Sequence, residues 1–245
     1  MIDFLMVSTR IRNKVTEIYP KFIIKRSSDL MIRGGDFYAI WIEEIGLWST
    51  DEQDALQLID RELDKYYEEN DSRFDGPTKI LHMWDAESGM IDSWHKYCQK
   101  QMRDSFQMLD EKLIFSNMVT TKKDYASKRL SYPLEPGDIS SYEELMSTIY
   151  SKEERHKIEW AIGSIVTGES RNLQKFIVLY GGPGTGKSTI LNIIQHLFDG
   201  YTAVFDAKAL GSANAQFALE PFKKNPLVAI QHDGDLSKIE DNTRL

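Results

Sequence analysis

Cysteine is nearly absent from the sequence, since Cys98 is the only one in 245 residues. An internal disulfide is therefore excluded, and so is a zinc ribbon or a cysteine-rich finger, because each needs several thiol groups. Long apolar runs are missing too, and none approaches the roughly 18 residues of a membrane-spanning helix. The N-terminus lacks the basic stretch, long apolar core and small cleavage residues of a secretory signal. We therefore expect a cytoplasmic protein that makes no contact with a membrane.

Glycine and proline are also scarce. The 15 glycines and 7 prolines exclude a collagen-like or low-complexity chain. Hydrophobic residues make up 41% and charged residues 28%, which is ordinary for a globular chain of one large or two small domains. The net charge is −8, and the acidic excess lies in residues 1–170. DNA binding would therefore need a local basic surface or a partner, because net charge alone does not attract nucleic acid.

The N-terminal part is expected to be a small α+β region. Short apolar and aromatic runs, separated by turn-like residues, predict an antiparallel sheet over 22–49. Thr50 precedes two acidic residues and is expected to cap a helix. Apolar residues at helical spacing predict another helix over 90–109, and residues 113–115 are expected to form a strand.

Two prolines and a glycine prevent a continuous helix through residues 132–137. We place the domain boundary there, with the α+β region over 1–135 and a second domain over 136–245. Serines followed by acidic residues predict that helices of the second domain begin near Ser141 and Ser151.

The segment 176–189 reads FIVLYGGPGTGKST. Its first five residues are apolar and predict a short buried strand. Residues 181–188 match the Walker A pattern G-x-x-x-x-G-K-[ST], and the apolar residues that follow have helical spacing. Strand, glycine-rich loop and helix thus have the order found in a P-loop NTPase. The alternative is a glycine turn that matches the pattern by coincidence.

The residue types of this loop suit the binding of a triphosphate. Glycines allow backbone N–H groups to approach the phosphates, and the helix that follows points its N-terminus at them. Lys187 is expected to bind the β- and γ-phosphates, and the Ser188 hydroxyl to coordinate Mg²⁺. The predicted nucleotide-binding residues are Gly181, Gly182, Pro183, Gly184, Thr185, Gly186, Lys187, Ser188 and Thr189.

A carboxylate that holds the metal is expected at the end of a neighbouring strand. Residues 227–230 are a short apolar run, and Asp233 follows shortly after it. Asp233 is assigned to Mg²⁺, and Asp235 is a second acid that polarises water or supports the first. Together with Lys187, these two acids are the predicted catalytic residues. The alternative for both acids is a plain Asp-Gly turn, and no metal role is assigned to His232.

The interval between Lys187 and Asp233 helps to separate the classes of P-loop protein. It has room for one helix, a strand over 203–205 and another helix over 214–222. This compact arrangement favours an AAA+-like or superfamily 3 helicase core over a larger RecA-like one.

Longer stretches carry a resemblance to a known family. The sequence from EWAIG at 159–163, through GGPGTGKSTILNIIQHLF, to LVAIQHDGDLS resembles the superfamily 3 helicase domain of phage and large-DNA-virus primase-helicases. The segment DYASKRLSYP at 124–133 is similar to the part that precedes the helicase core in that family. The resemblance covers about residues 110–245.

This resemblance implies an α/β fold with an AAA+-like P-loop core that binds ATP and Mg²⁺. It also implies a homo-oligomeric ring that couples ATP hydrolysis to DNA unwinding during replication, in the host cytoplasm if the source is viral. Asp233 is the best match to the Walker B acid. The segment reads His-Asp-Gly-Asp instead of the commoner pair of adjacent acids, so the identity of the catalytic carboxylate stays open.

The sequence ends at Leu245, shortly after Asp235. In the family, the DNA-gripping hairpin, the polar sensor residue and the arginine finger lie further along the chain. We therefore expect an incomplete AAA+-like core, from a truncated or split gene or a deliberately shortened chain. Such a fragment is expected to bind Mg-ATP and to unwind DNA weakly or not at all by itself.

Two other functions compete with a helicase. One is a nucleoside or nucleotide kinase, although residues 190–225 contain lysines and no arginine for a phosphate-binding lid. The other is a scaffold or binding module with a vestigial ATPase, in which residues 1–150 dock a partner. A measurement of nucleotide binding distinguishes the scaffold, which needs no affinity for ATP, from the helicase and the kinase.

Several further residues have two interpretations each. The basic residues around Tyr125 predict either a surface for phosphates and bases or an ordinary solvated loop. The tryptophans are expected to pack in the core and not to serve as platforms for bases. Cys98 is not expected to be catalytic. The basic residues are Lys122, Lys123, Lys128 and Arg129, and the tryptophans are Trp41, Trp48, Trp84, Trp94 and Trp160.

Overall fold

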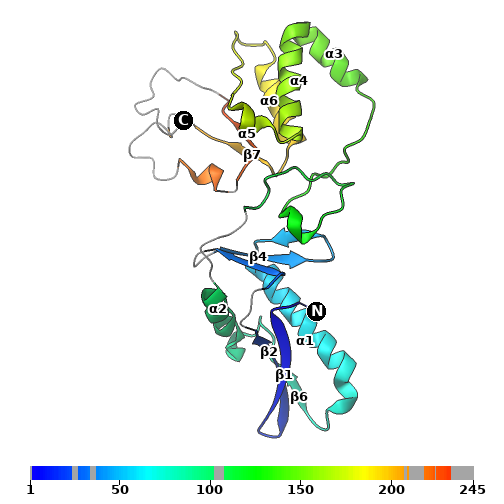
Figure 1. The fold of residues 1–245 in the computed structure, drawn as a ribbon, viewed down its shortest axis with the longest axis vertical. Coiled ribbons are helices and arrows are strands. Elements are labelled where there is room, and N and C mark those ends of the chain that lie inside the picture. The colour runs from blue at the N-terminus through cyan, green and yellow to red at the C-terminus, as the bar shows by residue number, and fades with distance from the viewer. Residues whose placement is uncertain are drawn as a thin grey trace. The chain divides into compact units, whose positions relative to one another are not determined.

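The chain divides into two compact units, each with helices, sheets and a core of its own (Figure 1). The first unit comprises Met1–Met108 and Thr120–Ser127, and the second comprises Leu109–Val119 and Lys128–Leu245. The computed structural model describes residues 2–23, 27–33, 37–101, 108–206, 209, 218–223 and 225–232.

Two three-stranded sheets form the β structure of the described part of the first unit. In one, β1 (Leu5–Arg12) and β2 (Val15–Phe22) make an antiparallel hairpin, and β6 (Thr78–Ile80) runs parallel to β2. In the other, β3 (Leu30–Arg33), β4 (Phe37–Ile42) and β5 (Leu47–Ser49) are all antiparallel. The antiparallel sheet predicted over 22–49 is confirmed for these three strands, whereas the hairpin was not predicted.

Two helices cover these sheets, α1 (Glu52–Asn70) and α2 (Met90–Gln101). The cap of α1 is Asp51, so the prediction of Thr50 is wrong by one residue. The Asp51 side chain accepts a hydrogen bond from the Gln53 N–H at 2.9 Å, and a carboxylate there also favours the positive end of the helix dipole. The helix predicted over 90–109 is described as far as Gln101, and residues 108 and 109 are not helical.

The first core joins residues from both sheets and both helices. Its fully buried members include Phe4 of the N-terminal segment, Ile40 of β4, Ile59 of α1 and Trp94 of α2. Phe4 and Trp94 have ring centroids 5.7 Å apart. Among its described residues, the unit also contains three short 3₁₀ turns: η1 (Asp71–Arg73), η2 (Ala86–Ser88) and η3 (Lys122–Asp124).

The second unit contains four helices and a two-stranded parallel sheet among its described residues. The helices are α3 (Ser140–Ile149), α4 (Lys152–Val166), α5 (Ser170–Leu173) and α6 (Lys187–Leu197). The strands are β7 (Thr202–Val204) and β8 (Val228–Ile230), with Ala203 opposite Ala229. Both strands lie where the sequence predicts them. Of the helix predicted over 214–222, the described part contains the 3₁₀ turn η4 (Glu220–Phe222).

The segment 113–115 is buried, but it is not the strand predicted from its apolar run. It is held by backbone hydrogen bonds from the Leu130 N–H to the Ile114 carbonyl (2.7 Å) and from the Ser116 N–H to the Tyr132 carbonyl (3.1 Å). Its Phe115 side chain packs with Phe198 in the core of the second unit, called the second core below. Residues predicted to belong to the N-terminal region thus form part of the core of the second unit.

Trp41, Trp48 and Trp94 are buried, as predicted. The prediction is wrong for Trp84 and Trp160, whose side chains are 73% and 45% exposed. Trp84 lies in the turn after buried Met83 and stacks on the His82 ring. In α4, Ile158 faces the core, and a residue two positions later points to the other side of a helix. No helix among the described residues is long and apolar enough to cross a membrane.

Candidate phosphate-binding site

The segment before the glycine-rich loop differs from the prediction. Residues 176–180 form no strand, and the side chains of Phe176, Val178 and Tyr180 are 83%, 63% and 99% exposed. Only Leu179 in this segment packs against the cluster of Met146, Ile158 and Ile190. The prediction of a buried strand is wrong because a strand forms only where another strand pairs with its backbone. Within the described residues, the sheet of this unit consists of β7 and β8 alone.

The loop itself has a backbone that depends on glycine. Gly184 and Gly186 have φ values of 79° and 76°, in the left-handed region that other residues rarely adopt. Gly186 is the N-cap of α6, and a Cβ atom added there would lie 2.7 Å from Cγ2 of Ile149. Both the turn into α6 and the close approach of α3 therefore require a glycine at this position.

Lys187 folds back over the loop. Its Nζ donates hydrogen bonds to the carbonyls of Gly181 (2.8 Å) and Gly182 (2.6 Å) and to Oγ1 of Thr185 (3.1 Å). The Thr185 hydroxyl in turn donates to the Gly182 carbonyl at 2.9 Å. The ammonium group is thus held at the loop by three neutral oxygens. An anion at the loop could replace these with charged oxygens, which form stronger hydrogen bonds.

The N-terminus of α6 faces the end of the loop with its donors uncapped. The first intrahelical hydrogen bond runs from the Ile190 N–H to the Gly186 carbonyl, so the N–H groups of Lys187, Ser188 and Thr189 have no partner within the helix. No side chain caps this end, and the first turn contains no acidic residue. The side chains of Ser188 and Thr189 are exposed. Backbone donors, helix dipole and Lys187 all favour an anion here.

The two acidic residues of the predicted site follow strand β8 in the sequence. Strand β8 ends at Ile230, which is buried, and exposed His232 follows two residues later. Asp233 and Asp235 lie outside the described residues. Within the described part of the chain, no group of three or more His, Cys, Asp or Glu side chains is arranged to hold a metal ion. Ser188 is therefore the one predicted metal ligand whose position is described.

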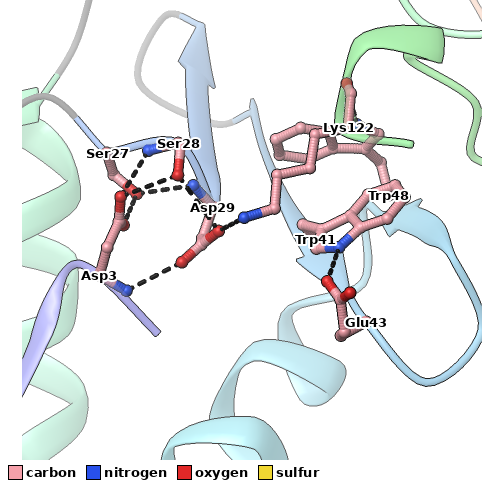
Figure 2. A network of polar contacts seen from close by, with 8 residues as sticks. All are labelled: Asp3, Ser27, Ser28, Asp29, Trp41, Glu43, Trp48 and Lys122. Carbon is pink, nitrogen blue, oxygen red and sulfur yellow. Dashed lines mark hydrogen bonds and ion pairs between the residues drawn. The ribbon is translucent and has the colours of Figure 1, made fainter. Parts of the chain in front are cut away.

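Two of the basic residues around Tyr125, Lys122 and Lys128, form ion pairs inside the protein. Lys122 forms an ion pair with buried Asp29, which also accepts a hydrogen bond from the Asp3 N–H (Figure 2). Lys128 lies 3.5 Å from Asp110, and the Tyr125 ring stacks on Trp48 with centroids 6.3 Å apart. These contacts favour a structural role over the binding of nucleic-acid phosphates and bases.

The network in Figure 2 ties separate segments of the first unit together. Asp3 accepts hydrogen bonds from Ser27 and Ser28, and Nε1 of Trp48 donates to the Lys122 carbonyl at 3.0 Å. These hydrogen bonds connect the N-terminal segment to the start of β3 and the η3 turn to β5. Asp3, Asp29, Trp48 and Lys122 each have a partner on the protein, which favours a structural role for this network.

Two buried groups are likewise structural. Burial raises the pKa of the Cys98 thiol to about 12, with a smaller contribution from Glu52, so this cysteine stays protonated at neutral pH and is a poor nucleophile. Burial also raises the pKa of Asp60, which accepts a hydrogen bond from the Met83 N–H at 2.6 Å. The raised pKa of Cys98 agrees with the prediction that this residue is not catalytic.

Comparisons with protein families, with characterised proteins and with solved structures find no match for this chain. The glycine-rich loop, Lys187 and the uncapped start of α6 are the predicted site residues that the structure brings together.

Proposed function

We propose that the loop from Gly181 to Gly186 and the N-terminus of α6 bind the phosphates of Mg-ATP. We further propose that the protein is an ATPase of DNA replication, of the superfamily 3 helicase type. ATP hydrolysis would then drive DNA unwinding in a homo-oligomeric ring of the complete protein.

One observation carries the proposal: the Lys187 ammonium lies over the loop beside a helix N-terminus that has no cap. On binding, Lys187 would exchange its contacts with Gly181 and Gly182 for oxygens of the β- and γ-phosphates. The backbone N–H groups of the first turn of α6 would hold the same anion. Ser188 would hold Mg²⁺, which when bound neutralises charge on the phosphate oxygens. Asp233 and Asp235 remain the proposed acids for the metal and the attacking water.

A non-catalytic binding module is a second candidate, and one observation favours it. The apolar segment 176–180 is mostly exposed and has no strand partner among the described residues. The loop is therefore not anchored on a strand, as a working motor would require. Nucleotide binding separates the two candidates, because a scaffold with a vestigial ATPase needs no affinity for ATP.

The test is calorimetric titration of the chain with Mg-ATP, followed by assays of ATP hydrolysis with and without single-stranded DNA. Lys187→Ala is expected to weaken ATP binding by about tenfold or more, since a hydrogen bond to a charged group contributes about 1.5–3 kcal/mol. Lys157→Ala is the matched control, because Lys157 lies on α4 in an exposed ion pair with Glu153. Its ATP affinity should equal that of the wild type.

A folded wild-type chain without measurable affinity for Mg-ATP would refute the proposal and favour the binding module. ATP binding without hydrolysis, even when DNA is added, would refute the motor and leave the phosphate site. Circular dichroism of each variant establishes that the chain is folded.

A further inference from the structure

Helix α6 carries an open groove that begins in its first turn. The groove has a volume of about 560 Å³ and is lined by Tyr132, Thr189, Asn192, Ile193, His196 and Leu197. All but Tyr132 lie on α6 at spacings of three and four residues, so they form one stripe along the helix. The groove therefore starts beside the phosphate-binding loop and ends at the C-terminus of the helix.

The side chains in the groove combine an apolar floor with directed polar groups. Nδ1 of His196 lies 2.8 Å from the Asn192 carbonyl, and because a carbonyl only accepts, Nδ1 carries the proton. In the tautomer with the proton on Nδ1 alone, Nε2 is an acceptor. The Tyr132 hydroxyl donates to the Leu197 carbonyl, and its ring packs edge-on against Phe115 with centroids 5.9 Å apart. Tyr132 is thus a fixed wall at the far end of the groove.

From these observations, and resting on the proposed function, we infer that the groove holds the base and ribose of the nucleotide whose phosphates bind at the loop. From Thr189 to His196 the helix rises about 10 Å. This length suits the nucleoside end of a nucleotide, and the volume lies in the range of about 300–1,000 Å³ typical of small-molecule sites. The His196 imidazole offers a surface on which a base stacks, and the Asn192 amide both donates and accepts hydrogen bonds.

The experiment compares two ligands on the full chain by calorimetry: Mg-ATP and magnesium tripolyphosphate, which has the phosphates and no nucleoside. The wild type is expected to bind ATP at least about tenfold more tightly, since stacking of one base contributes about 1–3 kcal/mol. His196→Ala and Asn192→Ala should each weaken ATP binding about threefold to tenfold and leave tripolyphosphate binding unchanged. Gln195→Ala, on the same helix but outside the groove, should change neither affinity.

The outcomes separate this inference from the proposed function. Equal affinities of the wild type for ATP and tripolyphosphate would refute nucleoside binding in the groove, but not phosphate binding at the loop. Nucleoside binding in the groove is also refuted if neither groove variant changes the affinity for ATP. If the folded wild type binds neither ligand, the phosphate site itself is refuted. If His196→Ala fails to fold, Asn192→Ala and His196→Gln provide the same comparison.

Discussion

Both the backbone conformation and the packing at position 186 require a glycine. Its φ of 76° allows the turn into α6, and its missing side chain leaves room for Ile149 of α3. The Walker A pattern accounts for this glycine by the approach of a phosphate. The structure adds a second reason, because Ile149 occupies the space on the side of the missing Cβ.

Gly186→Ala is expected to lower the free energy of unfolding of the second unit by about 2–4 kcal/mol. About 1 kcal/mol comes from the positive φ, and the rest comes from the contact with Ile149, since overpacking typically costs about 1–3 kcal/mol. The control is Gly163→Ala in the interior of α4, where an added Cβ meets no atom within 4 Å. That substitution should stabilise the helix by about 0.5–1 kcal/mol. Urea denaturation followed by circular dichroism measures both, and equal effects of the two variants would contradict this account.

Helix α4 begins at a position that its local sequence predicts. Ser151 accepts a hydrogen bond from the Glu154 N–H, and the Glu154 carboxylate accepts one from the Ser151 N–H at 2.9 Å. This reciprocal capping box confirms the helix start predicted near Ser151. It fixes the beginning of the helix that packs Ile158 against Ile190 of α6, and so supports the helix that follows the glycine-rich loop.

Ser151→Ala is expected to destabilise the second unit by about 1 kcal/mol, the usual cost of losing a serine N-cap. Ser147→Ala is the matched control, because Ser147 is exposed within α3 and its hydroxyl bonds only to the nearby Glu144 carbonyl. Its stability should stay within about 0.5 kcal/mol of the wild type. Thermal unfolding of both variants provides the measurement. A control variant as unstable as Ser151→Ala would show that the capping box is not the cause.

Elements whose signals are local could be predicted, whereas elements that depend on distant partners could not. The start of α4 follows from nearby residues, because its capping box spans only Ser151 to Glu154. The apolar runs at 176–180 and 113–115 look alike in sequence, yet one is largely exposed and the other is buried without forming a strand. A strand forms only where another strand pairs with it, and that information is not contained in five residues. The β1–β2 hairpin escaped prediction because Asn13 and Lys14 adopt positive φ values in its turn without a glycine to signal it.

The same distinction applies to the candidate site. The loop and the start of α6 could be predicted because a contiguous pattern encodes them. The groove residues Asn192 and His196 carry no motif of their own, although their helical spacing places them in line with Thr189. Tyr132 joins them from a distant part of the chain, so only the structure reveals its place in the groove.

At the scale of the whole molecule, the path of the chain explains why the two units are not consecutive halves. The chain enters the second unit at Leu109, returns to the first for Thr120–Ser127 and enters the second again at Lys128. The segments 109–119 and 128–135 carry residues that pack around Phe198 and Tyr201. The Tyr201 hydroxyl also donates to the Lys128 carbonyl at 2.7 Å. A cut at the boundary predicted from sequence, between residues 135 and 136, would therefore remove part of the second core.

A fragment of residues 136–245 is expected not to fold, whereas a fragment of 109–245 should retain a cooperative transition. The shorter fragment loses the buried side chains of Leu113, Phe115 and Leu130, and each contributes about 1.5–3 kcal/mol by burial. Their sum is comparable to the total stability of a typical domain, about 5–15 kcal/mol. Urea denaturation and binding of a hydrophobic dye distinguish the two fragments. Cooperative unfolding of 136–245 with the same midpoint as 109–245 would show that the two upstream segments are dispensable for this core.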